Sequence, residues 1–200
     1  MVKLKKESVQ MLHVKNKAVT QVTFDEDYNV PDVKPDIGRL VQSKTDVSMD
    51  EVRLSEGKAF LKGTLNVDLL YVGEKEGRIC SLSAKLPVDE DINLEGIEGG
   101  DKLCLNWEIE DLSAHVIHSR KLNLKAIVTF YAEVDELEKM EVPVSLDDPE
   151  VSVKKKTIQL MSLCIHKKDT LRIRDDIALA SNRPNVEELL WYTIEPRNLE

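Results

Sequence analysis

The chain has 200 residues, of which 42% are hydrophobic and 32% are charged, a balance typical of a globular protein with a buried core. Aromatic residues contribute only 4%, so we expect a core of Val, Leu, Ile and Met. The formal net charge of −9, from 37 acidic and 28 basic residues, argues against nonspecific binding to nucleic acid or to an anionic membrane. No apolar run has the length of a signal peptide or a transmembrane segment, so we expect a cytoplasmic protein.

The three cysteines, Cys80, Cys104 and Cys164, are odd in number and widely spaced, and no two of them form a CxxC pair. This usage predicts reduced, mostly buried thiols rather than a disulfide framework. A chain of this length can bury a sufficient core without disulfide or metal support.

The first segment with a distinctive pattern covers residues 35–41. Pro35 stands at what would be the first helical position and Asp36 follows at the positive end of the helix dipole. The apolar residues at 37, 40 and 41 would then fall on one side. The segment predicts one or two helical turns.

The pattern of the other elements is alternation of apolar and polar residues, the period of a half-buried β-strand. It covers residues 59–71, 80–86, 103–118 and 122–134. Within the third run the parity changes near Asp111, which predicts a β-bulge, and Trp107 is expected in the core. Turn residues separate the runs as in a meander of antiparallel strands. The predicted fold is mainly β, an antiparallel β-sandwich or flattened barrel of long strands with one or two short helical turns.

An internal repeat appears when the chain is compared with itself at a shift of 149 positions. Apolar positions coincide without a gap at this shift. The cationic residue before a proline recurs, because residues 34–37 align with 183–186, and the apolar pair 40–41 aligns with 189–190. We predict a complete β module in residues 1–150 and the start of a second, truncated copy in residues 151–200. The chain is then the amino-terminal piece of a longer protein, or its tail packs on the first module.

Residues capable of catalysis or metal binding do not converge in the sequence. His115 and His118 are three apart in a predicted strand and point to opposite faces, and no cysteine or carboxylate lies at zinc-ligand spacing. Cys164 and His166 share a strand face, but their repeat equivalents are lysines. The acidic clusters lack the pattern of a calcium loop, and no glycine motif for phosphate is present. We expect no catalytic residue, metal or cofactor.

The repeated motif around a proline and an aromatic pair near the end of the chain are the candidate interaction residues. The aromatic pair is a candidate contact surface because its partner strands are missing from the truncated copy. The candidates are Lys34, Pro35, Asp36, Arg183, Pro184, Trp191 and Tyr192.

Four stretches together resemble the SPOCS domain, which occurs in tandem in SipL-type clostridial spore-envelope proteins, often ahead of a LysM domain. They are Val30–Ile37, the strand Gly63–Tyr71, the Leu86-Pro87 step and Ser119–Ala126 with Asn123. The resemblance implies a non-enzymatic scaffold in the mother cell, at the forespore surface. It also implies other spore coat morphogenetic proteins as partners, including the basement-layer ATPase, which is contacted largely through the LysM part. Gly38-Arg39 departs from the acidic or bulkier pair usual in the family.

The expected function is spore coat and envelope assembly through protein–protein contacts of tandem β modules, with self-association or strand addition as the mode. The alternative is a module that binds carbohydrate or a peptidoglycan fragment, which requires an exposed aromatic platform. No nucleic acid and no transmembrane segment are expected.

Overall fold

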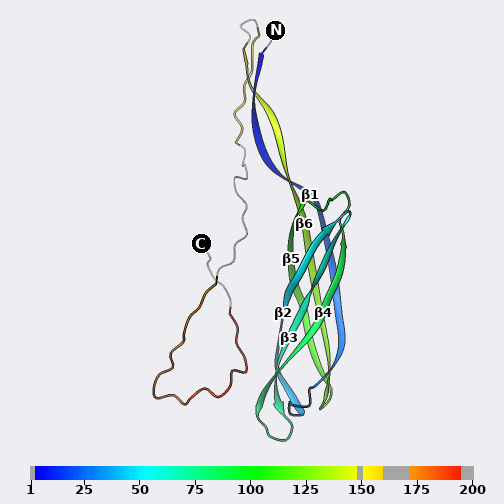
Figure 1. The fold of residues 1–200 in the computed structure, drawn as a ribbon, viewed down its shortest axis with the longest axis vertical. Helices are drawn as coiled ribbons and strands as arrows, with labels where there is room; N and C mark the ends of the chain where they lie inside the picture. Colours follow the sequence, from blue (N-terminus) through cyan, green and yellow to red (C-terminus); the bar gives the residue numbers. More distant parts are fainter. Residues whose placement is uncertain (1–2, 148–150, 160–171, 195–200) are drawn as a thin grey trace.

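The computed structural model describes residues 3–147, 151–159 and 172–194 of the chain (Figure 1). Its regular structure is six long antiparallel strands, which confirms the mainly β prediction. The strands are β1 (Lys3–Asn29), β2 (Ile37–Ser55), β3 (Lys58–Gly73), β4 (Ile79–Asn93), β5 (Lys102–His118) and β6 (Lys121–Asp147). No helix occurs among the described residues, and hence none with the length and hydropathy to cross a membrane.

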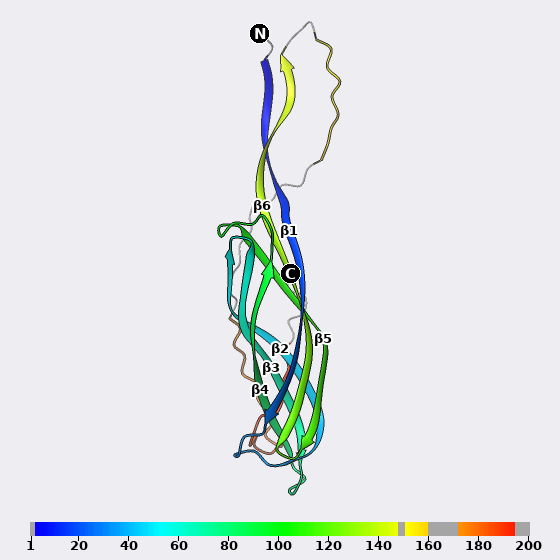
Figure 2. The same cartoon turned by 90° about the vertical axis from the view of Figure 1, so that its right-hand side faces the viewer.

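The strands form two three-stranded antiparallel sheets, β1-β6-β5 and β2-β3-β4. The sheets are stacked, with β2 against β5 and β1 against β4, as the two views show (Figures 1 and 2). The chain crosses between the sheets through the connections 30–36 and 94–101, whereas hairpins join the other consecutive strands. A β-sandwich is therefore the observed architecture.

The core lies between the sheets and consists of the inward residues of alternating strands. In β3 the odd-numbered residues from Ala59 to Tyr71 are buried, apart from the half-buried Gly63, and in β6 the even-numbered residues from Leu122 to Val134 are buried, as their alternation predicts. The largest fully buried side chains are Tyr71, Phe130, Leu61, Leu65, Leu69, Ile92, Leu94, Ile97, Leu122, Leu124, Val67 and Val128.

The prediction of helical turns at residues 35–41 is wrong, because β2 begins at Ile37. The register of β2 against β3 shifts between Ile37 and Arg39 and again between Leu40 and Gln42. These bulges turn both Ile37 and Leu40 inward although they are three residues apart, which imitates helical spacing. Gly38 fits the first bulge closely, since a Cβ there would lie 3.1 Å from the Val72 carbonyl oxygen.

The predicted bulge in β5 is confirmed by a register shift between Ile109 and Asp111. Trp107 is not in the core: it is 38% exposed, because β5 is an edge strand and its apolar side chains are covered incompletely. Cys104 is exposed on the same strand and Cys80 is half-buried, so the prediction of mostly buried thiols is not met for these two. Cys164 lies outside the described residues.

A two-stranded arm extends past the sandwich (Figure 1), formed by residues 4–13 of β1 and 136–146 of β6. It exists because β5 pairs with β6 only as far as Asp135, whereas β1 and β6 remain paired to the outer end. The strand predicted for residues 122–134 therefore continues to Asp147. We call this element the arm.

The connection 94–101 is fixed to β1 at the base of the arm. Lys15 Nζ lies 2.9 Å from Asp101 Oδ2, and the same oxygen accepts a hydrogen bond from the Glu98 N–H. Asn16 Nδ2 donates to the Glu95 carbonyl oxygen at 2.6 Å. The backbone hydrogen bond from Glu98 and the Lys15 ammonium lower the pKa of Asp101 below its ordinary value.

The buried position of Leu65 generates a stability prediction. Leu65→Ala should lower the free energy of unfolding by about 2–5 kcal/mol, because it removes apolar contacts and leaves a cavity between the sheets. Urea denaturation followed by circular dichroism measures this loss. Val19→Ala, at a residue 63% exposed on β1, is the control and should change stability by no more than about 0.5 kcal/mol. Equal losses for the two variants would contradict the assigned core.

The lowered pKa of Asp101 generates a prediction of pH dependence. A carboxyl with a depressed pKa in the folded state contributes stability above its unfolded pKa of about 3.9, and this contribution is lost as the pH falls through the folded pKa. Asp101→Asn should therefore lower the urea midpoint at pH 7, and the difference from the parent should shrink toward pH 3. Asp50→Asn, at an exposed position of β2, is the matched control. A difference independent of pH would refute the role of the charge.

Candidate functional site

The connection 30–36 carries three of the predicted interaction residues and lies at the end of the sandwich remote from the arm (Figure 1). It leaves β1 in one sheet and enters β2 in the other, next to the turn between β5 and β6. Its two prolines lack amide hydrogens, while its carbonyl groups and carboxylates offer acceptors. The connection therefore needs a donor from elsewhere in the fold.

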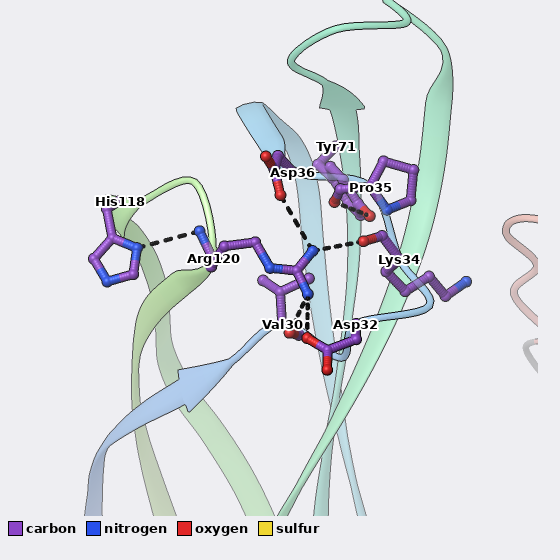
Figure 3. A network of polar contacts seen from close by, with 8 residues as sticks. All are labelled: Val30, Asp32, Lys34, Pro35, Asp36, Tyr71, His118 and Arg120. Atoms are coloured by element: carbon purple, nitrogen blue, oxygen red, sulfur yellow. Dashed lines mark hydrogen bonds and ion pairs between the residues drawn. The ribbon is translucent and has the colours of Figure 1, made fainter.

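Arg120, in the β5–β6 turn, supplies these donors (Figure 3). Its Nη1 donates to the Lys34 carbonyl oxygen at 2.6 Å and to Asp36 Oδ1 at 3.2 Å. Its Nη2 donates to the Val30 carbonyl oxygen at 2.9 Å and to Asp32 Oδ1 at 3.2 Å. One planar guanidinium thus binds two backbone carbonyl groups and two carboxylates of the same connection, as the fork geometry of arginine permits. We call this arrangement the Arg120 clamp.

Backbone hydrogen bonds fix both ends of the connection to the same turn. The Val30 N–H donates to the Arg120 carbonyl oxygen at 2.9 Å, and the Ile37 N–H donates to the Ser119 carbonyl oxygen at 2.8 Å. The Arg120 N–H in turn donates to His118 Nδ1 at 3.2 Å. The clamp therefore joins the edge of one sheet to the start of the other.

Tyr71, near the end of β3, holds the connection close to the start of β2 (Figure 3). Its hydroxyl donates to the Pro35 carbonyl oxygen at 3.0 Å, while its ring is fully buried in the core. Burial raises the pKa of Tyr71 above its ordinary value of 10.0, and the hydroxyl is protonated at neutral pH with or without this shift. Pro35 is thereby anchored to the core as well as to the turn.

Lys34, Pro35 and Asp36 are thus brought together, and their backbone and carboxylate groups serve the clamp. The Lys34 and Pro35 side chains line a surface hollow with Arg78 and with Glu188 from the tail. Sequence reasoning did not single out Arg120 as the partner of this motif. The available signal was an arginine in a two-residue turn, combined with two aspartates beside the prolines.

Trp191 and Tyr192 contact Lys44 of β2. The sequence had not identified a contact partner for this aromatic pair. Lys44 Nζ is 4.8 Å from the centroid of the Trp191 ring and 5.1 Å from that of the Tyr192 ring. The same ammonium donates to the Tyr192 carbonyl oxygen and lies 3.6 Å from Asp68 Oδ2. These distances are those of a cation–π contact with both rings. The tail is therefore attached to the sandwich at this point.

Arg183 and Pro184 occupy an exposed turn of the tail. The Arg183 N–H donates to the Ala180 carbonyl oxygen at 2.9 Å, which closes the turn locally. The structure does not place this turn beside the equivalent motif of the first module. The role of Arg183 and Pro184 in interaction stays a prediction.

Residues 36–117 match the family model described as SipL, SPOCS domain. The match begins at Asp36 of the clamp and covers β2, β3, β4 and most of β5, so it confirms the resemblance for the central strands. No curated protein and no solved structure gives a significant match. A SPOCS domain indicates a spore-related role for the chain.

The clamp generates a prediction on stability. Arg120→Ala should lower the free energy of unfolding by about 1–3 kcal/mol, because two partly buried carbonyl groups lose their donors. Arg120→Lys should recover only part of this loss, since an ammonium cannot reproduce the planar fork. Urea denaturation measures both.

Lys121→Ala is the control for the clamp. Lys121 follows Arg120 in the chain and forms a surface ion pair, with Nζ 2.7 Å from Asp27 Oδ2. Its loss should lower the free energy of unfolding by less than about 1 kcal/mol. A loss for Arg120→Ala no larger than this would show that the clamp does not stabilise the fold.

Proposed function

We propose that the chain is a non-enzymatic scaffold for assembly of the spore coat and envelope, and that it acts through protein–protein contacts of its β module. The observation that carries this proposal is the arm, a two-stranded ribbon that pairs with no third strand among the described residues, although residues 153–158 line a hollow beside the outer part of β6. The SPOCS match supports the cellular setting. The expected site is the mother cell, at the forespore surface.

Open strand edges present unpaired N–H and C=O groups, and proteins normally shorten or cover them. An isolated two-stranded ribbon is also marginally stable in water, so a third strand would stabilise the arm. Several apolar side chains on the arm are exposed to solvent, and clustered exposed apolar side chains are typical of interaction surfaces. They are Leu4, Leu12, Leu137, Met140 and Val144.

The charges on the arm differ between its two strands. Residues 4–13 of β1 carry Lys5, Lys6 and Glu7, whereas residues 136–146 of β6 carry Glu136, Glu138, Lys139 and Glu141. Lys6 and Glu141 already pair with each other, with Lys6 Nζ 2.9 Å from Glu141 Oε2. The β6 strand of the arm keeps a net negative charge, which favours a basic partner strand on that edge. Strand addition by another coat morphogenetic protein, or by a second copy of the chain, fits such edges. The basement-layer ATPase is a proposed partner of the longer protein.

The alternative function, glycan binding, requires aromatic rings on one face. Trp107 and Tyr131 are both partly exposed, but the register places Trp107 opposite Phe130 and Asn106 opposite Tyr131. Neighbouring residues of a strand point to opposite faces, so the two rings do not form one platform. The assembly proposal is therefore preferred.

The arm generates a prediction on assembly. Leu12 and Leu137 are directly opposite in the register, and replacing both by threonine keeps strand propensity while removing apolar surface. Capture of purified coat morphogenetic proteins, or self-association measured by light scattering, should fall at least about tenfold, which corresponds to about 1.4 kcal/mol. Unchanged circular dichroism would show that the sandwich remains folded.

Val52→Thr, at an exposed position of β2 away from the arm, is the control and should assemble like the parent. The proposal fails if the parent chain is monomeric at all concentrations and captures none of these proteins. A saturable change of tryptophan fluorescence with muropeptides would instead favour the glycan-binding alternative.

A further inference from the structure

We propose that the outer face of β2 around Lys44 is the docking surface for residues 188–192 of the same chain, and that this contact forms the junction between the first module and the copy predicted to follow it. The inference goes beyond the assembly function, because it concerns contacts within one chain. Its occupant is a segment that carries one acidic residue, Glu188, and two aromatic residues, Trp191 and Tyr192.

The contact at Lys44 combines several interactions on one ammonium group. Both rings of the aromatic pair lie within about 5 Å of Lys44 Nζ, at 4.8 and 5.1 Å. The hydrogen bond to the Tyr192 carbonyl oxygen fixes the backbone, and Asp68 Oδ2 lies 3.6 Å from the same ammonium. A cation placed in this way recognises an aromatic pair and does not bind an apolar strand equally well.

Burial in the tail is confined to this contact. Within residues 172–194 only Leu190 and Trp191 are half-buried, and the other residues are exposed. β2 is the edge strand of its sheet, and no described strand pairs with its outer edge. The tail is held by the Lys44 side chain, which lies opposite Asp68 on the outer face of the sheet, and in the described part of the chain no backbone hydrogen bond joins residues 188–192 to β2.

A second point of contact gives the direction of the tail. Glu188 lines a hollow together with Lys34, Glu76 and Arg78, while the Tyr192 carbonyl oxygen accepts a hydrogen bond from Lys44 farther along β2. The segment therefore runs along β2 in the same direction as β2 itself. The shift of 149 positions equates residues 189–192 with 40–43 of β2. Equivalent strands of two repeats lie parallel when the repeats follow each other by translation, as in stacked repeat proteins.

The contact also has a polarity. The residue equivalent to Lys44 in the second copy is Thr193, and the residues equivalent to Trp191 and Tyr192 in the first copy are Gln42 and Ser43. The first module thus carries the cation and the second carries the rings. The junction is heterologous, which fixes the order of the two modules.

Tryptophan fluorescence tests this junction directly. In the Trp107→Phe background Trp191 is the single tryptophan of the chain. Lys44→Ala should shift its emission to longer wavelength and increase acrylamide quenching at least about twofold, whereas Lys44→Arg should retain the parent values because arginine also contacts aromatic faces. Lys85→Ala, at an exposed position of β4, is the control.

Unchanged emission and quenching in Lys44→Ala would overturn the proposal, as would an equal change in Lys85→Ala. Emission that depends on protein concentration would show that the segment docks on another copy, which overturns the intrachain occupant. Tyr192→Ala supplies a second variant that leaves β2 intact, and in the Trp107→Phe background it should also increase acrylamide quenching of Trp191, because one of the two rings on Lys44 is lost. Assembly through the arm is measured separately, so failure of the junction is distinguishable from failure of the scaffold function.

Discussion

The structure depends on how the chain crosses between two sheets that are joined by packing rather than by a continuous ladder of hydrogen bonds. Arg120 meets this constraint at one end, because its guanidinium holds the connection that leaves β1 and enters β2. Lys15 and Asp101 hold the other crossing at the opposite end of the sandwich. With both crossings fixed, the inward faces of β3 and β6 can bury a core made almost entirely of aliphatic side chains.

The same strand lengths that build the sandwich create its surfaces for interaction. β1 and β6 have 27 residues each, whereas β5 has 17, so the longer pair must continue beyond its neighbour. The arm is the direct consequence, and its open edges are the basis of the proposed scaffold role. β2 differs, because its Lys44 side chain already contacts Trp191 and Tyr192 of the tail.

The predictions from sequence succeeded where local pattern and burial agree. Alternation located β3, β4, β5 and the part of β6 within the sandwich, but not β1 or β2, and the change of parity near Asp111 located a bulge. The pattern failed at residues 37–41, because two bulges in β2 reproduce the spacing of a helix and only the pairing with β3 reveals them. Trp107 was misplaced because alternation identifies a face of a strand but not whether that strand lies at the edge of its sheet.

The amino-acid sequence by itself determined the class of the fold, the faces of the strands and the proline motif at residues 34–36, since these follow from periodicity and local chemistry. Tertiary structure decided which strands pair and where the arm begins. It also decided which side chain binds the proline motif. Arg120 is 84 residues from Asp36, and Lys44 is 148 residues from Tyr192. No local pattern connects residues at such separations: the first contact arises when the connection 30–36 meets the β5–β6 turn, and the second when the tail meets β2.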